Sequence, residues 1–167
     1  GRSFNETFFN TSRDVGLFSR FSAALFAKNY AILIQDDDIE LPAETIEALY
    51  NSWREEPAKI HGIFGRRPKS DGSYARNIDR ADADVEVVLT RCLVASRTVH
   101  IPEFFRYAPF FEHVIKQYQK PLGNGEDILF SYCSMFRSGE QNRVHKLPTK
   151  ELPAPHAIHQ RDWKGHL

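Results

Sequence analysis

The sequence predicts an α/β fold with a mostly parallel sheet flanked by helices. Apolar runs of strand length alternate with segments in which apolar residues recur every three or four positions, as in parallel sheets covered by helices. The strand predicted at 30–34 is apolar on both faces, which is typical of a strand inside such a sheet, and it ends abruptly at three aspartates. Ligands of open α/β sheets bind beyond the carboxyl ends of the strands, so the aspartates lie where a binding site is expected.

Two helices are predicted around the strand at 30–34. Thr11 or Ser12 caps the first helix, and Lys28 ends it. Pro42 opens the second helix, where the missing N–H group of proline costs nothing. The expected inward-facing residues are Val15, Phe18, Phe21 and Leu25 in the first helix and Ile46, Leu49 and Trp53 in the second.

The rest of the chain mixes strands, helices and polar segments. The polar stretch at 65–83 is predicted to be a long loop or a loose hairpin, and loops of this length are often functional. The other predicted elements are strands at 60–64, 84–96 (bent near Arg91) and 143–147, helices at 102–119 and 126–136, and an irregular tail at 148–167.

Length and charge restrict the class of protein. A chain of 167 residues corresponds to a single domain, 1–167. Its 22 basic and 22 acidic residues give no net charge, whereas a general binder of nucleic acid or of anionic membranes needs a basic surplus. We therefore expect no nucleic-acid partner. No apolar run approaches the roughly 18 residues of a transmembrane helix, so we expect no membrane span either. Cys92 and Cys133 are expected to be buried free thiols.

The acidic motif after the first strand consists of Asp36, Asp37 and Asp38. Repulsion among three neighbouring carboxylates raises their pKa values unless a cation balances them, and hard divalent cations prefer oxygen ligands. Alternate side chains of an extended segment share a direction, so Asp36 and Asp38 can point to one side. The alternative is a solvated acidic loop without a ligand.

A second acidic motif, Glu126 and Asp127, begins the helix predicted at 126–136. Acidic residues stabilise a helix N-terminus through the helix dipole, so simple capping is one interpretation. The other is a carboxylate that faces a reacting centre or accepts a hydrogen bond from a substrate hydroxyl.

The order of these motifs resembles the C-terminal glycosyltransferase domain of the exostosin family, which has the GT-A fold. The resemblance extends from about Phe18 to about Leu147 and is carried by the strand with the three aspartates, the helix with Trp53, the strand at 60–64 and the segment 124–128. It implies a metal-dependent transferase that moves a sugar, such as an N-acetylhexosamine, from a nucleotide-sugar donor to a glycan or another hydroxyl acceptor with retention of anomeric configuration.

The resemblance also implies roles for individual residues. Residues 36–38 match the family's DxD motif, which binds Mn²⁺ (or Mg²⁺) and the diphosphate of the donor. Asp38 is the first-choice metal ligand, together with Asp36, and Asp37 belongs to the donor-binding set. Arg20 matches an arginine that contacts the nucleotide. The pair at 126–127 matches the family's acidic residues near the transferred sugar.

Two features depart from the family pattern. Gly125 stands where eukaryotic members tend to have a cysteine, so a disulfide at that position is absent. The strand–helix–strand unit that opens a GT-A domain and binds the nucleotide base is not recognised, so we expect a truncated nucleotide-binding unit. Localisation stays open between the Golgi or ER lumen of a eukaryote and the cytoplasm of a bacterium.

The proposed chemistry also follows from residue types. Breaking a sugar–diphosphate bond leaves negative charge on the departing phosphate, which a divalent cation stabilises. Asp127 is the first choice for the carboxylate that faces the positive anomeric carbon, followed by Glu126. Further basic groups that could meet the phosphates are Arg66, Arg67, His156, His159, Arg161 and Lys164.

Two alternatives come from other functional classes. A Mg²⁺-dependent phosphohydrolase or nucleotidyltransferase also uses aspartates at a strand end, although no suitably placed lysine follows Asp38. A non-catalytic domain that binds a cation or a glycan is the second alternative. The sequence does not identify the donor sugar or the acceptor.

Overall fold

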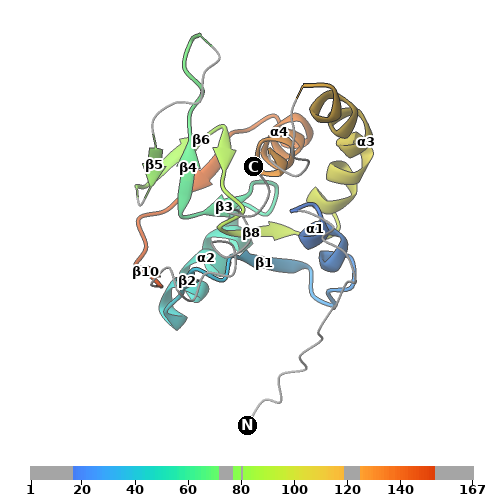
Figure 1. Cartoon of the computed structure of the whole chain (residues 1–167). Helices are drawn as coiled ribbons and strands as arrows, with labels where there is room; N and C mark the ends of the chain where they lie inside the picture. Colours follow the sequence, from blue (N-terminus) through green and yellow to red (C-terminus); the bar gives the residue numbers. More distant parts are fainter. Residues whose placement is uncertain (1–16, 72–76, 80, 119–124, 153–167) are drawn as a thin grey trace.

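A computed structural model describes residues 17–71, 77–79, 81–118 and 125–152 of the chain (Figure 1). The helices within these ranges are α1 (Ser19–Ala24), α2 (Ala43–Glu55), α3 (His100–Tyr118) and α4 (Glu126–Ser138). The strands are β1 (Ala31–Gln35), β2 (Ile39–Glu40), β3 (His61–Gly62), β4 (Phe64–Arg66), β5 (Asn77–Asp79), β6 (Ala83–Val85), β7 (Val87–Val88), β8 (Cys92–Ser96), β9 (Asn142–Val144) and β10 (Lys150–Glu151).

The largest sheet in the described part of the chain has five strands in the order β1-β8-β3-β9-β6. Within it, β3 and β9 pair in parallel, and the other neighbouring strands pair antiparallel. The fold is therefore α/β, but the prediction of a mostly parallel sheet is wrong. Apolar runs mark where strands lie and not which way they run, and direction is set by the connections between them.

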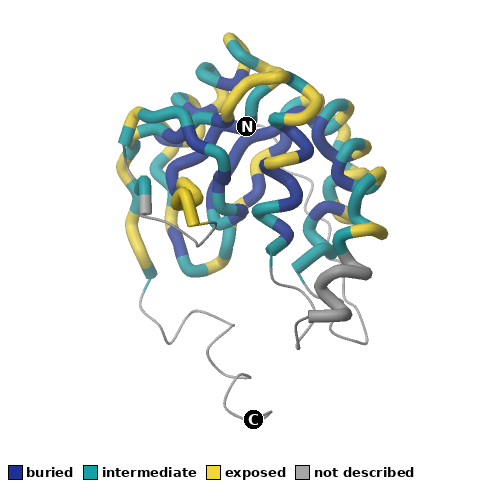
Figure 2. Tube along the Cα trace, turned by 90° about the horizontal axis from the view of Figure 1, so that it is seen from above, coloured by how far each residue is buried: buried dark blue, intermediate teal, exposed yellow. Residues whose placement is uncertain are grey.

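Helices cover both faces of this sheet. Figure 1 shows α2 on one side and α1, α3 and α4 on the other. Each side has its own cluster of buried residues, and Figure 2 shows the buried part of the chain at the centre of the molecule. Members of the α1/α3/α4 side are Phe21, Ile32, Ile34, Leu93, Phe104 and Phe130, and members of the α2 side are Ile39, Leu49, Trp53, Phe64, Cys92 and Val94.

The strand that is buried on both faces is β8 and not β1. All five residues of β8 are buried, because β1 and β3 pair with its two edges and helices pack on both sides. In β1, Ile32 and Ile34 are buried but Leu33 is 39% exposed. The prediction that the strand before the aspartates lies in the sheet interior is therefore wrong.

Two of the residues predicted to face inward are exposed. Leu25 is 50% exposed because α1 ends at Ala24, so the helical periodicity does not continue to it. Ile46 is 38% exposed, and Thr45 takes the inward position on α2, where its hydroxyl donates to the carbonyl of Pro148 at 2.7 Å. Phe21, Leu49 and Trp53 are buried as predicted. Val15 and both predicted cap residues lie outside the described residues.

The structure adds detail to three predicted segments. The stretch predicted as one strand at 84–96 is divided into β6, β7 and β8, with its main break at Thr90 and Arg91. The segment 65–83 includes a hairpin, one of its two predicted forms, because β5 pairs antiparallel with β4. In the predicted irregular tail, β10 pairs with β2, and residues 153–167 are not described.

The two cysteines are buried and free, as predicted. Burial raises the pKa of the Cys92 thiol to about 12 and that of Cys133 to about 11, so both remain protonated at neutral pH. They therefore act as small apolar core groups.

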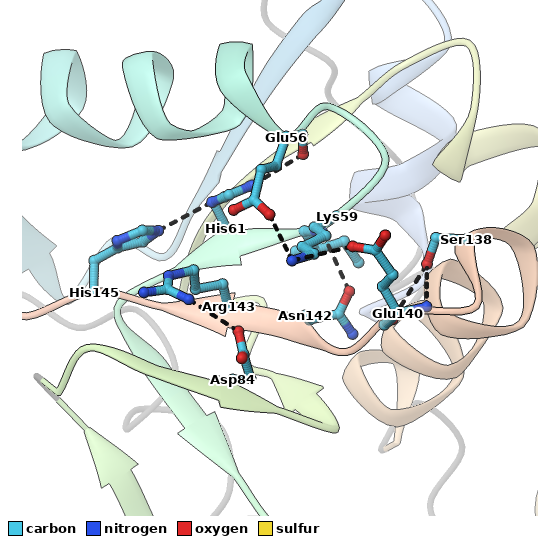
Figure 3. Close-up of polar contacts among 10 residues, drawn as sticks. Glu56, Lys59, His61, Asp84, Ser138, Glu140, Asn142, Arg143 and His145 are labelled. Atoms are coloured by element: carbon cyan, nitrogen blue, oxygen red, sulfur yellow. Dashed lines mark hydrogen bonds and ion pairs between the residues drawn. The ribbon is translucent and has the colours of Figure 1, made fainter.

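Two histidines lie in contact beside the parallel strands β3 and β9 (Figure 3). His61, on β3, is buried, and His145, directly after β9, is partly buried. His61 Nδ1 lies 3.0 Å from His145 Nε2, and the two rings stack with centroids 5.3 Å apart. His61 Nε2 lies 3.1 Å from the carbonyl oxygen of Glu56, which can only accept. When both rings are neutral, His61 therefore donates from Nε2, and His145 donates from its own Nε2 to His61 Nδ1.

The environment of this pair opposes protonation. Burial lowers the pKa of His61, and burial, followed by the charges of His61 and Arg143, lowers the pKa of His145 to about 4. Doubly protonated rings would also have no acceptor between them. The pair is therefore neutral in the folded protein at neutral pH.

This neutral pair makes stability depend on pH. An unfolded histidine takes up a proton below about pH 6.5, whereas folded His145 does so only near pH 4, so the free energy of unfolding should fall as the pH falls across this window. His145→Gln should reduce that fall by about 1–2 kcal/mol. Urea denaturation between pH 7.5 and 4.5 measures the effect, and equal slopes in both proteins would contradict it.

Candidate active site

The acidic turn after β1 is fixed by backbone hydrogen bonds on two sides. The N–H group of Asp36 donates to the carbonyl of Arg91 at 2.9 Å, which extends the β1–β8 pairing to the first aspartate. The carbonyl of Asp38 accepts from the N–H group of Leu152 at 2.8 Å, beside the β2–β10 pair. Asp37 lies exposed between them. The carboxylates are therefore held at the carboxyl end of β1.

Arg20, on α1, reaches this turn. Its Nη1 donates to Asp36 Oδ1 at 2.8 Å and to the carbonyl oxygen of Thr90 at 3.2 Å. Phe21, the next residue, is fully buried against Phe104 and Phe130, so the helix that carries Arg20 is anchored in the core. The structure thus brings the predicted arginine and the first aspartate together.

Glu126 joins the same polar cluster from the first turn of α4. Thr90 Oγ1 donates to Glu126 Oε1 at 3.0 Å, and both side chains are buried. Together with the bonds of Arg20, this contact forms a connected chain from Asp36 through Arg20 and Thr90 to Glu126. Gly125, directly before the helix, has φ of 94°, which a residue with a Cβ atom rarely adopts, so glycine suits this position.

The two acidic residues at the start of α4 have different surroundings. Burial, followed by the charge of Asp127, raises the pKa of Glu126, while Thr90 and Arg20 partly oppose the increase. Asp127 is half-buried, and its Oδ1 accepts from the N–H group of Ile128 at 2.8 Å. The carboxyl group of Glu126 is therefore easier to protonate than an ordinary glutamate.

Arg91 contacts the third aspartate with two nitrogen atoms. Its Nε lies 3.3 Å from Asp38 Oδ1, and its Nη2 lies 3.2 Å from Asp38 Oδ2. Its Nη1 also lies 3.4 Å from Glu151 Oε1, and its guanidinium carbon lies 4.8 Å from the ring centre of Phe64. The guanidinium is thus held between the acidic turn, β10 and β4.

Thr90 and Arg91 were not among the residues predicted for this site. Their only signal is two polar residues inside an apolar stretch, where the sequence predicted a bend near Arg91. Both residues lie just before β8, and the antiparallel pairing of β1 with β8 brings them beside the aspartates. That neighbourhood depends on strand pairing and cannot be seen in the local sequence.

Other predicted basic residues lie elsewhere. Arg66, on β4, pairs with Asp79 on β5 at 2.7 Å, and Arg67, just after β4, donates to the carbonyl of Asp84 on β6. Both arginines therefore connect β4 to strands that follow it. His156, His159, Arg161 and Lys164 fall outside the described residues.

The oxygen atoms at the end of β1 suit a hard divalent cation. The described residues contain no cluster of three or more His, Cys, Asp and Glu side chains placed to hold a metal. Magnesium sites, however, commonly use one or two carboxylates and complete the shell with substrate phosphates and water. Asp36 and Asp38 provide such a partial set, although each carboxylate contacts an arginine here.

A comparison with protein families identifies the class of the chain. Residues 7–153 match the model of the glycosyl transferase family 64 domain, which covers both acidic motifs and Arg20. The chain belongs to glycosyltransferase family 64. It is therefore an exostosin-like glycosyltransferase domain, as the sequence predicted, and the match favours this class over the phosphohydrolase alternative.

Two further findings concern this glycosyltransferase domain. A search of curated proteins gave no match to the chain. Among the described residues, none of the helices combines the length and the apolar character that crossing a membrane requires.

The contact between Thr90 and Glu126 gives a direct test of the cluster. Thr90→Val removes a hydroxyl that lowers the pKa of Glu126, so this pKa should rise further above its ordinary value. Carbon-13 NMR titration of the glutamate carboxyl groups measures it. Thr45→Val, which removes a buried hydroxyl bonded to Pro148, is the matched control and should leave Glu126 unchanged. An unchanged Glu126 pKa in Thr90→Val would contradict the assigned contact.

Proposed function

We propose that this glycosyltransferase domain transfers a sugar of the N-acetylhexosamine class from a UDP-linked donor to a hydroxyl group of a glycan or similar acceptor, with retention. In this proposal residues 1–167 belong to a GT-A-type catalytic domain. One observation carries it: Asp36 and Glu126, which belong to two distant motifs, lie in one connected polar cluster with Arg20 and Thr90. A site for one substrate needs such convergence, whereas a solvated loop and a simple helix cap do not.

The donor side of the proposed site is the end of β1. Asp36 and Asp38 would hold Mn²⁺ or Mg²⁺ with oxygen atoms, and Asp37 and Arg20 would contact the donor. When bound, the cation stabilises the negative charge that develops on the departing diphosphate. Arg20, already fixed by Asp36 and Thr90, adds a positive charge whose position requires no rearrangement.

The reacting side is the start of α4. The bond between the anomeric carbon and the diphosphate oxygen breaks, and its electron pair leaves with the diphosphate. The acceptor hydroxyl oxygen forms the new bond to the anomeric carbon on the same face, and its proton passes to the departing diphosphate. Asp127 is the carboxylate proposed to face the positive charge left on the sugar. Glu126 is buried and has a raised pKa, so it is better suited than Asp127 to form a hydrogen bond with a sugar hydroxyl.

Donor binding should depend on a divalent cation and on Asp38. Titration calorimetry is expected to detect UDP binding in Mn²⁺ and much weaker binding in EDTA, because the cation links the carboxylates to the diphosphate. Asp38→Ala should abolish the Mn²⁺-dependent part, while Glu40→Ala, which removes an exposed carboxylate on β2, should bind normally. Absence of UDP binding to the full-length protein in Mn²⁺ would refute the proposed donor.

Asp127 should matter for transfer rather than for donor binding. Asp127→Asn is expected to retain UDP binding and to lower turnover by about 100-fold or more, since a neutral amide cannot stabilise the developing positive charge. The assay measures release of UDP from UDP-sugars with a glycan acceptor. Asp82→Asn, an exposed aspartate on another part of the surface, should have normal turnover. Normal turnover in Asp127→Asn would remove this residue from the mechanism.

A further inference from the structure

The ion pair between Arg91 and Asp38 has an unusual position. Both oxygen atoms of Asp38 receive a nitrogen of the same guanidinium, at 3.3 and 3.2 Å. Asp38 is also the first-choice ligand in the cation site proposed above. A guanidinium in this arrangement neutralises the carboxylate and covers the face that it contacts.

Arg91 has anchors that do not depend on Asp38. Its guanidinium carbon lies 4.8 Å from the centre of the Phe64 ring, and its Nη1 lies 3.4 Å from Glu151 Oε1. The backbone carbonyl of Arg91 also accepts from the N–H group of Asp36. Loss of the contact with Asp38 would therefore leave the positive charge beside the acidic turn.

We propose that Arg91 is a built-in counter-ion of Asp38 that competes with the divalent cation for this carboxylate. The role requires the cation site of the proposed function. A cation bound to Asp38 without a donor must displace the guanidinium, and it then lies next to a second positive charge. Both effects weaken binding of the cation alone.

The same arrangement couples the cation to the donor. A diphosphate beside the displaced guanidinium neutralises the extra positive charge, so the cation should bind more tightly when a nucleoside diphosphate is present. By linkage, the cation increases the affinity for the diphosphate by the same factor. Arg91 would thus favour joint binding of cation and donor over binding of the cation alone.

Electron paramagnetic resonance of Mn²⁺ tests this role without an activity assay. Free Mn²⁺ is titrated with the unaltered chain and with Arg91→Gln, first without and then with UDP. Arg91→Gln should bind Mn²⁺ alone about two- to fivefold more tightly, the range expected for a partly exposed ion pair. It should also show a smaller gain in Mn²⁺ affinity on addition of UDP.

Three variants serve as controls. Arg66→Gln removes a comparable arginine–aspartate pair, with Asp79, and should leave Mn²⁺ affinity unchanged. The double variant Asp38→Asn/Arg91→Gln should not bind Mn²⁺ more tightly than the unaltered chain, which assigns the effect of Arg91→Gln to its pair with Asp38. Arg91→Lys keeps the charge without the two-pronged contact and should bind Mn²⁺ with intermediate affinity. If circular dichroism shows that Arg91→Gln is unfolded, Arg91→Lys decides the question.

The outcomes separate this role from the proposed function. Unchanged or weaker Mn²⁺ binding in a folded Arg91→Gln protein overturns the competition, even if the unaltered chain binds UDP in Mn²⁺. Failure of both proteins to bind Mn²⁺ overturns it as well. Failure of UDP binding, with tighter Mn²⁺ binding in Arg91→Gln, supports the competition and counts against the proposed donor instead.

Discussion

The candidate site depends on the antiparallel pairing of β1 with β8. This pairing brings the end of β1 beside Thr90 and Arg91, which precede β8. Through these two residues, α1, α4 and β10 are all connected to the acidic turn. The backbone pairing of β1 with β8 sets where each side chain of the turn begins. One strand register therefore determines which carboxylates and arginines become neighbours.

Charge balance around the turn follows from that register. Asp36 and Asp38 each contact an arginine, one from α1 and one from the start of β8. The carboxyl group of Glu126 is buried, and its pKa is raised. At this site acidic and basic groups are thus paired locally, in a chain whose 22 acidic and 22 basic residues also balance overall. Because the arginines are partly buried, salt screens their charges less than those of surface groups.

Polar interior groups on the other part of the sheet have a different role. His61 on β3 and His145, directly after β9, lie beside the parallel strand pair and satisfy one another and a backbone carbonyl. Trp53 is fixed in the same way, since its indole N–H donates to Ser96 at 3.0 Å. These buried hydrogen bonds leave few alternative arrangements for the strands, which keeps the edge that carries the aspartates in register.

The sequence by itself determined the class of protein, most of the helices and strands, and the two acidic motifs. It could do so because periodicity, capping residues and charge runs are local signals, and because the order of motifs matches one family. It did not determine the direction of the strands, the exposure of Leu33 or the roles of Thr90 and Arg91. Those depend on which strands pair and on which residues face each other across the pairing. Only the tertiary structure decides them, because contacts between distant segments leave no trace in the local pattern.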